Sequence, residues 1–191
     1  MNVVIIGCGR VGALLADTFD QAGHRVTIID LQTRAFDRLS ESFRGEAIRG
    51  NGTDEDVLRR AGAEGADLFI AVTEGDNRNV MATQIALEAL HVGQVIAKVN
   101  DPVRAEAYAA MGIPTLCRTI LMADAILGYV GLPTSGTPPI LSPTGHHPGG
   151  ADHHGPAATG EAAGGAGAGG AAAGGTGAGG TSGALATARE V

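Results

Sequence analysis

A glycine motif near the start of the chain has the residue types and spacing that bind a pyrophosphate. An apolar run over residues 3–6 leads into Gly7, Gly9 and Gly12 in GxGxxG spacing, and a helical pattern follows. In such a motif Gly7 permits a tight turn, Gly9 lets the backbone approach the phosphates, and Gly12 lets the helix pack closely on the strand. The phosphates would then meet the free N–H groups and the positive end of the helix.

A carboxylate follows at the position where ribose binding needs one. The next β-branched run, over residues 25–29, ends in Asp30, which lies 18 residues after Gly12. A carboxylate there accepts the ribose hydroxyls and repels a 2′-phosphate, so NAD is expected to bind better than NADP. The two features predict a nucleotide site. The alternative is a bare strand–turn–helix with a solvated aspartate at a strand end.

Six repeats of strand and helix are expected to position these groups. The apolar runs predict strands at residues 3–6, 25–30, 47–48, 68–72, 95–99 and 114–117. The helical patterns cover residues 11–22, 33–43, 55–61, 77–91, 101–112 and 119–130. Right-handed crossovers make this an α/β fold, a doubly wound parallel sheet of the Rossmann type in strand order 3-2-1-4-5-6. The ligand then sits at the carboxyl ends of the strands, in loops 7–12, 30–32, 50–54 and 73–79.

Composition divides the chain into a domain and a tail. From about Pro133 onward the 191-residue chain consists mainly of Gly, Ala, Ser, Thr, Pro and His. Such a segment cannot bury enough apolar surface to offset its ordering entropy. We therefore expect a nucleotide-binding domain over residues 1–132 and a disordered Gly/Ala/Pro/His-rich tail over residues 133–191. The histidine pairs at 146–147 and 153–154 are not expected to form a dedicated metal site.

Charge, cysteines and hydropathy disfavour other classes of protein. The formal net charge of −7 argues against nucleic-acid binding, which needs a basic face. Cys8 and Cys117 form neither a disulfide framework nor a metal motif, so we expect small buried thiols in a reducing cytoplasm. The sequence shows no secretory leader, and the apolar stretch 120–132 contains Asp124 and is too short to span a membrane. We expect a soluble protein that meets a membrane only through a partner.

Taken together, the predicted ligand loops and the fifth strand resemble one family. The motifs that match are Gly7-Cys8-Gly9-Arg10-Val11-Gly12, Asp30, Gly50-Asn51-Gly52-Thr53-Asp54, Ala71-Val72-Thr73 with Asp76 and Asn79, and Lys98-Val99-Asn100-Asp101-Pro102. In combination they resemble the TrkA-N domain, the N-terminal domain of the RCK regulators. The resemblance covers residues 1–132.

The resemblance implies a regulatory protein rather than a catalytic one. Members of the family bind NAD(H), ATP or ADP on the cytoplasmic side of potassium channels and transporters, and they assemble as dimers and often as rings that gate the membrane subunit. For this chain it implies NAD(H) first and ATP or ADP second, with a membrane-integral potassium transporter subunit as partner. The cofactor-binding residues that it implies are Gly7, Cys8, Gly9, Arg10, Val11, Gly12, Asp30, Leu31, Asn51, Gly52, Thr53, Thr73, Asp76, Asn79 and Lys98.

Several implied roles compete with simpler ones. Arg10 would reach a terminal phosphate or a neighbouring subunit's ligand, or else it is a solvated residue of the first helical turn. Asn51 and Thr53 would flank the adenine. Thr73 would border the ligand over the fourth strand, although Thr73 and Asp76 could also serve only as helix caps.

Three further expectations concern the second half of the domain. Asn79 is expected on the ligand side or as a capping group rather than in the core. Lys98 matches a basic position of the family, or it is the exposed end of a strand. The apolar helix over residues 120–130 would form a dimer contact, and the alternative is packing on its own sheet.

Two departures from the family pattern leave the function open. Asn51 stands where the family usually has aspartate, which affects the preference between nucleotides. The tail stands where a typical member continues into a second ligand-binding domain. One alternative is an NAD-dependent oxidoreductase, for which Lys98 is the one candidate acid–base group. The other is a truncated accessory partner that forms a hetero-oligomer with a complete homologue.

Overall fold

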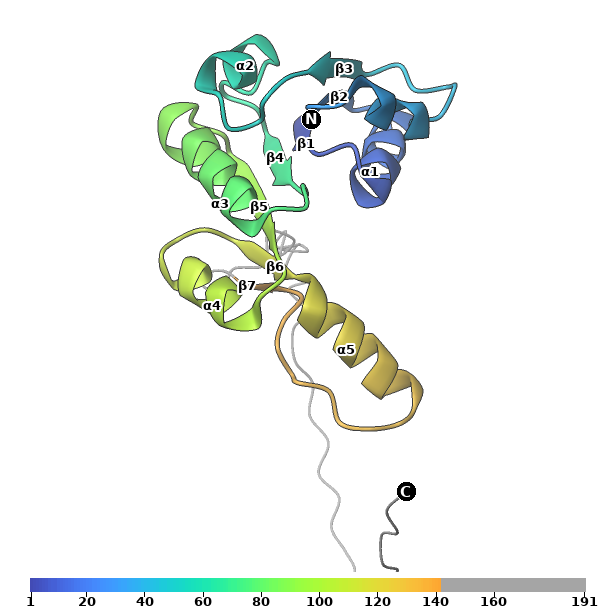
Figure 1. The fold of residues 1–191 in the computed structure, drawn as a ribbon, viewed down its shortest axis with the longest axis vertical. Coiled ribbons are helices and arrows are strands. Elements are labelled where there is room, and N and C mark those ends of the chain that lie inside the picture. The colour runs from blue at the N-terminus through green and yellow to red at the C-terminus, as the bar shows by residue number, and fades with distance from the viewer. Residues whose placement is uncertain (142–191) are drawn as a thin grey trace, which may run out of the picture. The chain divides into compact units, whose positions relative to one another are not determined.

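A seven-stranded sheet is the frame of the fold. The computed structural model describes residues 1–141, and its strands lie in the order β3-β2-β1-β4-β5-β6-β7 (Figure 1). The strands are β1 (Asn2–Ile6), β2 (Arg25–Asp30), β3 (Glu46–Arg49), β4 (Leu68–Ala71), β5 (Gln94–Val99), β6 (Thr115–Cys117) and β7 (Ile140–Leu141). All pairs are parallel except β6 with β7. The predicted doubly wound order is confirmed, with one antiparallel strand added at its edge.

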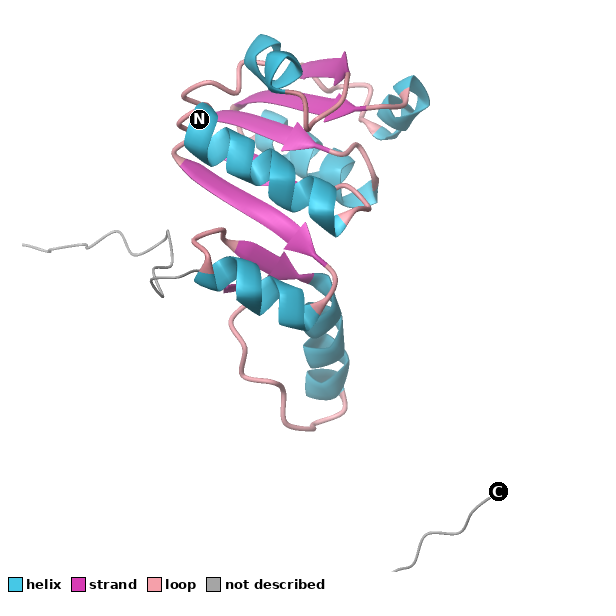
Figure 2. Cartoon of the chain, turned by 60° about the vertical axis from the view of Figure 1, so that its left-hand side comes forward, coloured by secondary structure: helices cyan, strands magenta, loops and turns pink. Residues whose placement is uncertain are grey.

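Helices cover both faces of the sheet (Figure 2). They are α1 (Arg10–Gln21), the 3₁₀ helix η1 (Thr33–Arg38), α2 (Glu55–Arg60), α3 (Asp76–Gln84), its π-helical continuation η2 (Ile85–Ala89), α4 (Pro102–Ala110) and α5 (Arg118–Tyr129). The α1 and η1 helices pack on one face, and α2, α3 and α4 pack on the other. Between β1 and β4 the chain therefore changes from one face to the other, which opens a crevice at their carboxyl ends.

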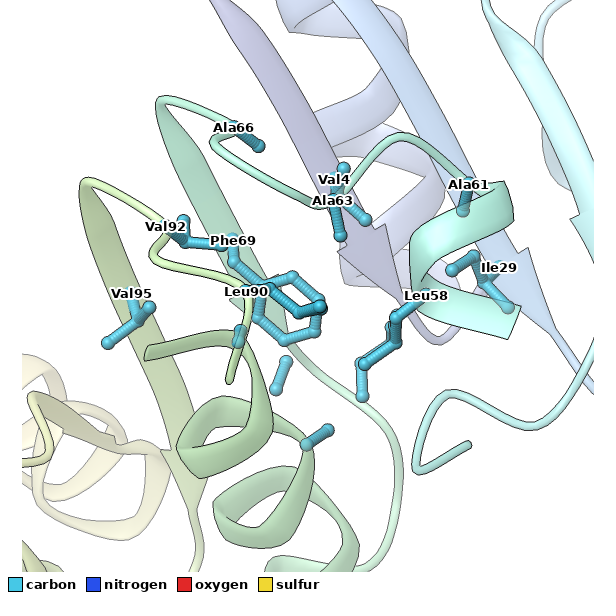
Figure 3. Close-up of a cluster of buried hydrophobic side chains, with 14 of the residues drawn as sticks. Val4, Ile29, Leu58, Ala61, Ala63, Ala66, Phe69, Leu90, Val92 and Val95 are labelled. Carbon is cyan, nitrogen blue, oxygen red and sulfur yellow. The ribbon is translucent and has the colours of Figure 1, made fainter. Parts of the chain in front are cut away.

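The central strand is apolar on both sides because both of its faces are covered. Val3 and Ile5 of β1 belong to the core with α1, whereas Val4 and Ile6 belong to the core with α2 and α3. Phe69 of β4 is fully buried in this second cluster, and Figure 3 shows its ring beside Leu90. Continuous apolar runs are typical of strands in a parallel sheet that is covered on both faces.

The second predicted helix is wrong in type and length. Residues 33–43 were expected to be α-helical, but η1 is a 3₁₀ helix that ends at Arg38. The next residue, Leu39, is extended (φ −71°, ψ 148°), and the Asp17 carboxylate of α1 accepts the backbone N–H of Ser40 at 3.2 Å. This bond to α1 replaces a further helical turn. Phe43 nevertheless packs against the core on the α1 face.

The described chain continues past the predicted end of the domain at Leu132. The Asp124 carboxylate of α5 accepts the N–H and hydroxyl of Ser135 at 2.8 and 2.6 Å, and residues 140–141 then pair with β6. Leu141 packs beside the core cluster of β5 and α4, and the burial of its apolar surface stabilises the pairing of β7 with β6. Residues 133–141 therefore differ from the expected disordered tail. Residues 142–191, with both histidine pairs, lie outside the described residues.

Within residues 1–141, no helix is both long and apolar enough to cross a membrane.

Replacing Phe69 tests the core that carries the crevice. Phe69→Ala removes a fully buried ring from the centre of its cluster and leaves a cavity, so the free energy of unfolding should fall by about 3–5 kcal/mol. Val103→Ala, at a side chain that is 76% exposed, is the control and should cost less than about 1 kcal/mol. Denaturant titrations of the full chain measure both. Equal losses for the two variants would contradict the assignment of Phe69 to the core.

Candidate nucleotide-binding site

A cleft lies at the carboxyl ends of β2, β1 and β4. Seven of the predicted site residues line it, namely Gly7, Cys8, Gly9, Asp30, Leu31, Gly52 and Thr73. The other residues that line it are Ile6, Ile29, Gln32, Ala35, Arg38, Gly50, Val72, Glu74 and Arg78. All four predicted ligand loops thus contribute residues to the lining of one cleft, as the strand order requires.

The three glycines of the motif are needed for different reasons, two for the fold and one for ligand access. Gly7 has φ +97°, and a Cβ there would lie 2.9 Å from the backbone nitrogen of Thr73. A Cβ on Gly12 would lie 1.9 Å from the carbonyl oxygen of Gly7, so α1 can pack this closely only with glycine. A Cβ on Gly9 would meet nothing within 4 Å. The fold itself requires Gly7 and Gly12, whereas the open space at Gly9 suits the approach of a ligand to the backbone.

The start of α1 offers backbone donors that no side chain occupies. Gly9 is its N-cap residue and makes no side-chain capping bond, and the first turn carries no acidic residue. By contrast, Asp54 and Asp101 cap α2 and α4, each accepting two backbone N–H groups. Free N–H groups and the positive end of a helix attract phosphate, so the start of α1 is suited to bind an anionic group of a ligand in the cleft.

The Asp30 carboxylate is held in a fixed position between two loops. One oxygen accepts the backbone N–H of Cys8 at 2.8 Å, and the other accepts that of Gln32 at 2.9 Å. Each carboxylate oxygen keeps a further lone pair for a ribose hydroxyl. Burial, and next the nearby Asp30 charge, raise the pKa of the Cys8 thiol to about 11, so it stays neutral at physiological pH and donates to the carbonyl of Ala35.

Asn79 lies beneath the cleft wall rather than in it. Its side chain is fully buried, and its Oδ1 accepts the backbone N–H and the hydroxyl of Thr73 at 2.9 and 2.6 Å. Its Nδ2 donates to the carbonyls of Thr73 and Lys98 at 3.1 and 2.9 Å. Asn79 therefore fixes the loop after β4 and does not line the ligand side, because all its polar atoms are used inside the protein.

Asp76 and Lys98 also lie outside the cleft lining. The Asp76 carboxylate accepts the N–H and the side-chain amide of Asn100 at 3.0 and 2.7 Å, which ties α3 to the end of β5. Lys98 is half-buried, and desolvation, followed by the charge of Arg118, lowers its pKa. Asp76 therefore supports the end of β5, and neither residue contributes to the lining.

The remaining predicted residues surround the cleft without lining it. Arg10 and Val11 are exposed at the start of α1. The Oδ1 of Asn51 accepts the N–H and hydroxyl of Thr53 at 3.2 and 2.9 Å, so this pair shapes a turn of the loop after β3. Gly52, by contrast, lines the cleft, and a Cβ on it would lie 2.9 Å from the side chain of Ile6, which explains the glycine at this position.

Three charged lining residues, Glu74, Arg78 and Arg38, are not among the predicted site residues. Glu74 and Arg78 belong to the predicted ligand loop over residues 73–79, so the strand-end rule alone could have included them. Arg38 could not be found in the same way, because the sequence placed it in the middle of a longer helix. Its guanidinium donates to the carbonyl of Ala35 at 3.3 Å.

Asn79→Asp tests whether the buried amide holds the cleft wall. The introduced carboxylate would face the carbonyls of Thr73 and Lys98 without a proton to donate, so we expect a loss of about 3 kcal/mol at pH 7. Burial raises the folded-state pKa of the new carboxyl above its unfolded value near 4, so the loss should grow as pH rises and be smallest below about pH 4. Denaturant titrations at several pH values measure it. The exposed Asn77→Asp is the control, and an equal, pH-independent loss there would contradict the role of Asn79.

Comparison with known proteins agrees with this geometry. The family model described as TrkA-N domain matches residues 3–119. The Trk system potassium uptake protein TrkA of Streptomyces coelicolor is 45% identical over 145 residues, which cover 76% of this chain and 65% of that protein. A TrkA homolog of Pyrococcus abyssi is 34% identical over 102 residues, or 53% of this chain and 45% of the homolog. The chain thus spans less than two thirds of the length of either relative.

Solved structures share the fold at low sequence identity. The TrkA-N domain of the inner membrane protein ybaL from Escherichia coli has a TM-score of 0.61 at 19% identity, covering 68% of this chain and 96% of that one. The GsuK channel bound to NAD and GsuK bound to ADP each have a TM-score of 0.55 at 19% identity; each match covers 66% of this chain, and 23% and 33% of those chains. Because the family model matches more than half of the sequence, the chain belongs to the TrkA-N domain family.

Proposed function

We propose that the chain is a cytoplasmic nucleotide-binding regulatory subunit of a potassium uptake transporter or channel. The observation that carries the nucleotide part is the cleft, where a glycine turn, an uncapped helix start and a fixed Asp30 carboxylate lie together. These groups match the phosphates and the ribose of one ligand. Binding of the nucleotide would change how the subunit gates its membrane partner.

NAD(H) is the first candidate ligand, and ATP or ADP is the second. The Asp30 carboxylate supports an unmodified ribose, because it would repel a 2′-phosphate. The channel GsuK, which shares the fold, is named as bound to NAD in one structure and to ADP in another. Both ligands contain the adenosine and diphosphate that the cleft is suited to bind.

The potassium link rests on the relatives. The Streptomyces and Pyrococcus proteins are both named as Trk system potassium uptake proteins or homologs. For this chain we propose a regulatory role, with a membrane-integral transporter subunit as partner and a location on the inner face of the membrane through that partner. The Cys8 thiol is neutral, and Lys98 lies outside the lining of the cleft, so neither side chain is placed as an acid–base group for an oxidoreductase. This also supports a regulatory role.

We further propose that α5 is a contact between subunits. None of its residues is buried, and large apolar side chains are exposed on it and just after it: Met122 57%, Ile126 59%, Tyr129 92%, Val130 58% and Leu132 56%. An apolar surface of this kind is typical of an association site. The expected assembly is a homodimer, a higher ring or a hetero-oligomer with a homologue.

Gly9→Val tests the nucleotide site without disturbing the fold. The new side chain would occupy the open space that we assign to the phosphates, so affinity for NAD, NADH, ATP and ADP should fall about 100-fold or more. Gly9 has φ −78° and ψ −172°, which valine adopts, so the free energy of unfolding should change by less than about 1 kcal/mol. Calorimetric titration and denaturant unfolding of the full chain measure the two effects.

Two variants serve as controls for this titration. Gly128→Val changes α5, away from the cleft, and should leave nucleotide affinity unchanged. Gly12→Ala should instead destabilise the protein, because its Cβ would meet the Gly7 carbonyl. Unchanged affinity in Gly9→Val, or no binding of any nucleotide to the unsubstituted chain, would refute the proposed site.

The α5 contact predicts a change in molecular mass. Met122→Glu combined with Ile126→Glu places two charges on the exposed apolar surface, so the assembly should dissociate to monomers in light scattering at a fixed protein concentration. Met111→Glu makes the same chemical change at a residue that is 68% exposed but outside α5, and the assembly should persist. A monomeric unsubstituted chain would rule out self-association through α5.

A further inference from the structure

The cleft has two ends with different chemistry. The strands that border it lie in the order β2, β1, β4, so its lining runs from Asp30 after β2, over the glycine turn, to Glu74 and Arg78 after β4 (Figure 1). The Asp30 end accepts hydroxyl groups. The end at β4 carries the two opposite charges of Glu74 and Arg78.

Arg78 is a cation available to a ligand. It is the third residue of α3, it is exposed, and it lines the cleft. Over residues 1–141 its guanidinium has no hydrogen bond or ion pair within the structure. By contrast, Arg38 donates to a backbone carbonyl, and Arg59 pairs with Glu55 and Glu64.

The direction of the ligand decides what reaches Arg78. With its ribose on Asp30 and its diphosphate over the glycine turn, the next group of the ligand lies toward the end of β4. In ATP this next group is the third phosphate, and in NAD(H) it is the uncharged second ribose, whereas ADP has no group beyond its diphosphate. A guanidinium binds a phosphate through two parallel charge-assisted hydrogen bonds and gains little from a ribose.

We infer that Arg78 binds the terminal phosphate of a nucleoside triphosphate and thereby sets the preference of the cleft between triphosphates and dinucleotides. This inference rests on the proposed nucleotide site and specifies its ligand class. Glu74, four residues earlier on the same wall, opposes Arg78 by repelling the phosphate. The two residues together give the cleft a selectivity that depends on the charge of the ligand's far end.

Arg78→Gln separates the ligand classes. It should weaken ATP binding about tenfold or more and change ADP, AMP and NAD binding less than about twofold, because only ATP places a phosphate beyond the glycine turn, at the β4 end. Arg25→Gln removes the same charge at the amino end of β2, at the opposite end of the strands from the cleft, and should change no affinity. Glu74→Gln should have the reverse effect and strengthen ATP binding severalfold. Calorimetric titrations of the full chain with these four nucleotides measure all three variants.

The outcomes distinguish this inference from the proposed function. Equal losses for ATP and NAD in Arg78→Gln, an unchanged ATP affinity, or an equal loss of ATP affinity in Arg25→Gln would overturn the role of Arg78 and leave the nucleotide site standing. Binding of NAD without any binding of ATP to the unsubstituted chain would do the same. Failure of the unsubstituted chain to bind any of the four nucleotides would overturn both proposals.

Discussion

The close approach of the first helix to the turn before it is the contact on which the site depends. Gly12 lies so near the Gly7 carbonyl that a single added carbon would overlap it, and Gly7 in turn lies against the backbone of Thr73. This packing brings the start of α1, the end of β1 and the end of β4 together. It leaves Gly9 as the one motif glycine that faces open space, so the same contact that closes the fold also exposes backbone donors to a ligand.

Around that contact, hydrogen-bonded polar groups hold the walls of the cleft. Asn79 makes four hydrogen bonds inside the protein, and Asp30 makes two with backbone N–H groups on either side of it. Groups fixed in this way lose little conformational freedom when a ligand arrives. The two charged residues that line the β4 end of the cleft, Glu74 and Arg78, are by contrast exposed.

Strand order and the position of the cleft could be predicted from the sequence because both follow from long-period patterns. Alternating apolar runs and helices fix the doubly wound sheet, and the glycine spacing together with Asp30 marks its switch point. What could not be predicted depends on single tertiary contacts. The Asp17 bond to Ser40 shortens the second helix, and burial of Asn79 removes it from the lining, although the residue before it, Arg78, lines the cleft. Local spacing carries no information on either contact.

The two edges of the sheet are closed in different ways. On one side β3 carries the charged residues Glu46 and Arg49, and on the other β7 covers β6 directly after Pro138 and Pro139, which have no N–H to donate. Charged edges and prolines both disfavour the addition of a further strand. Over residues 1–141, both edges of the sheet therefore disfavour polymerisation of the protein through its backbone.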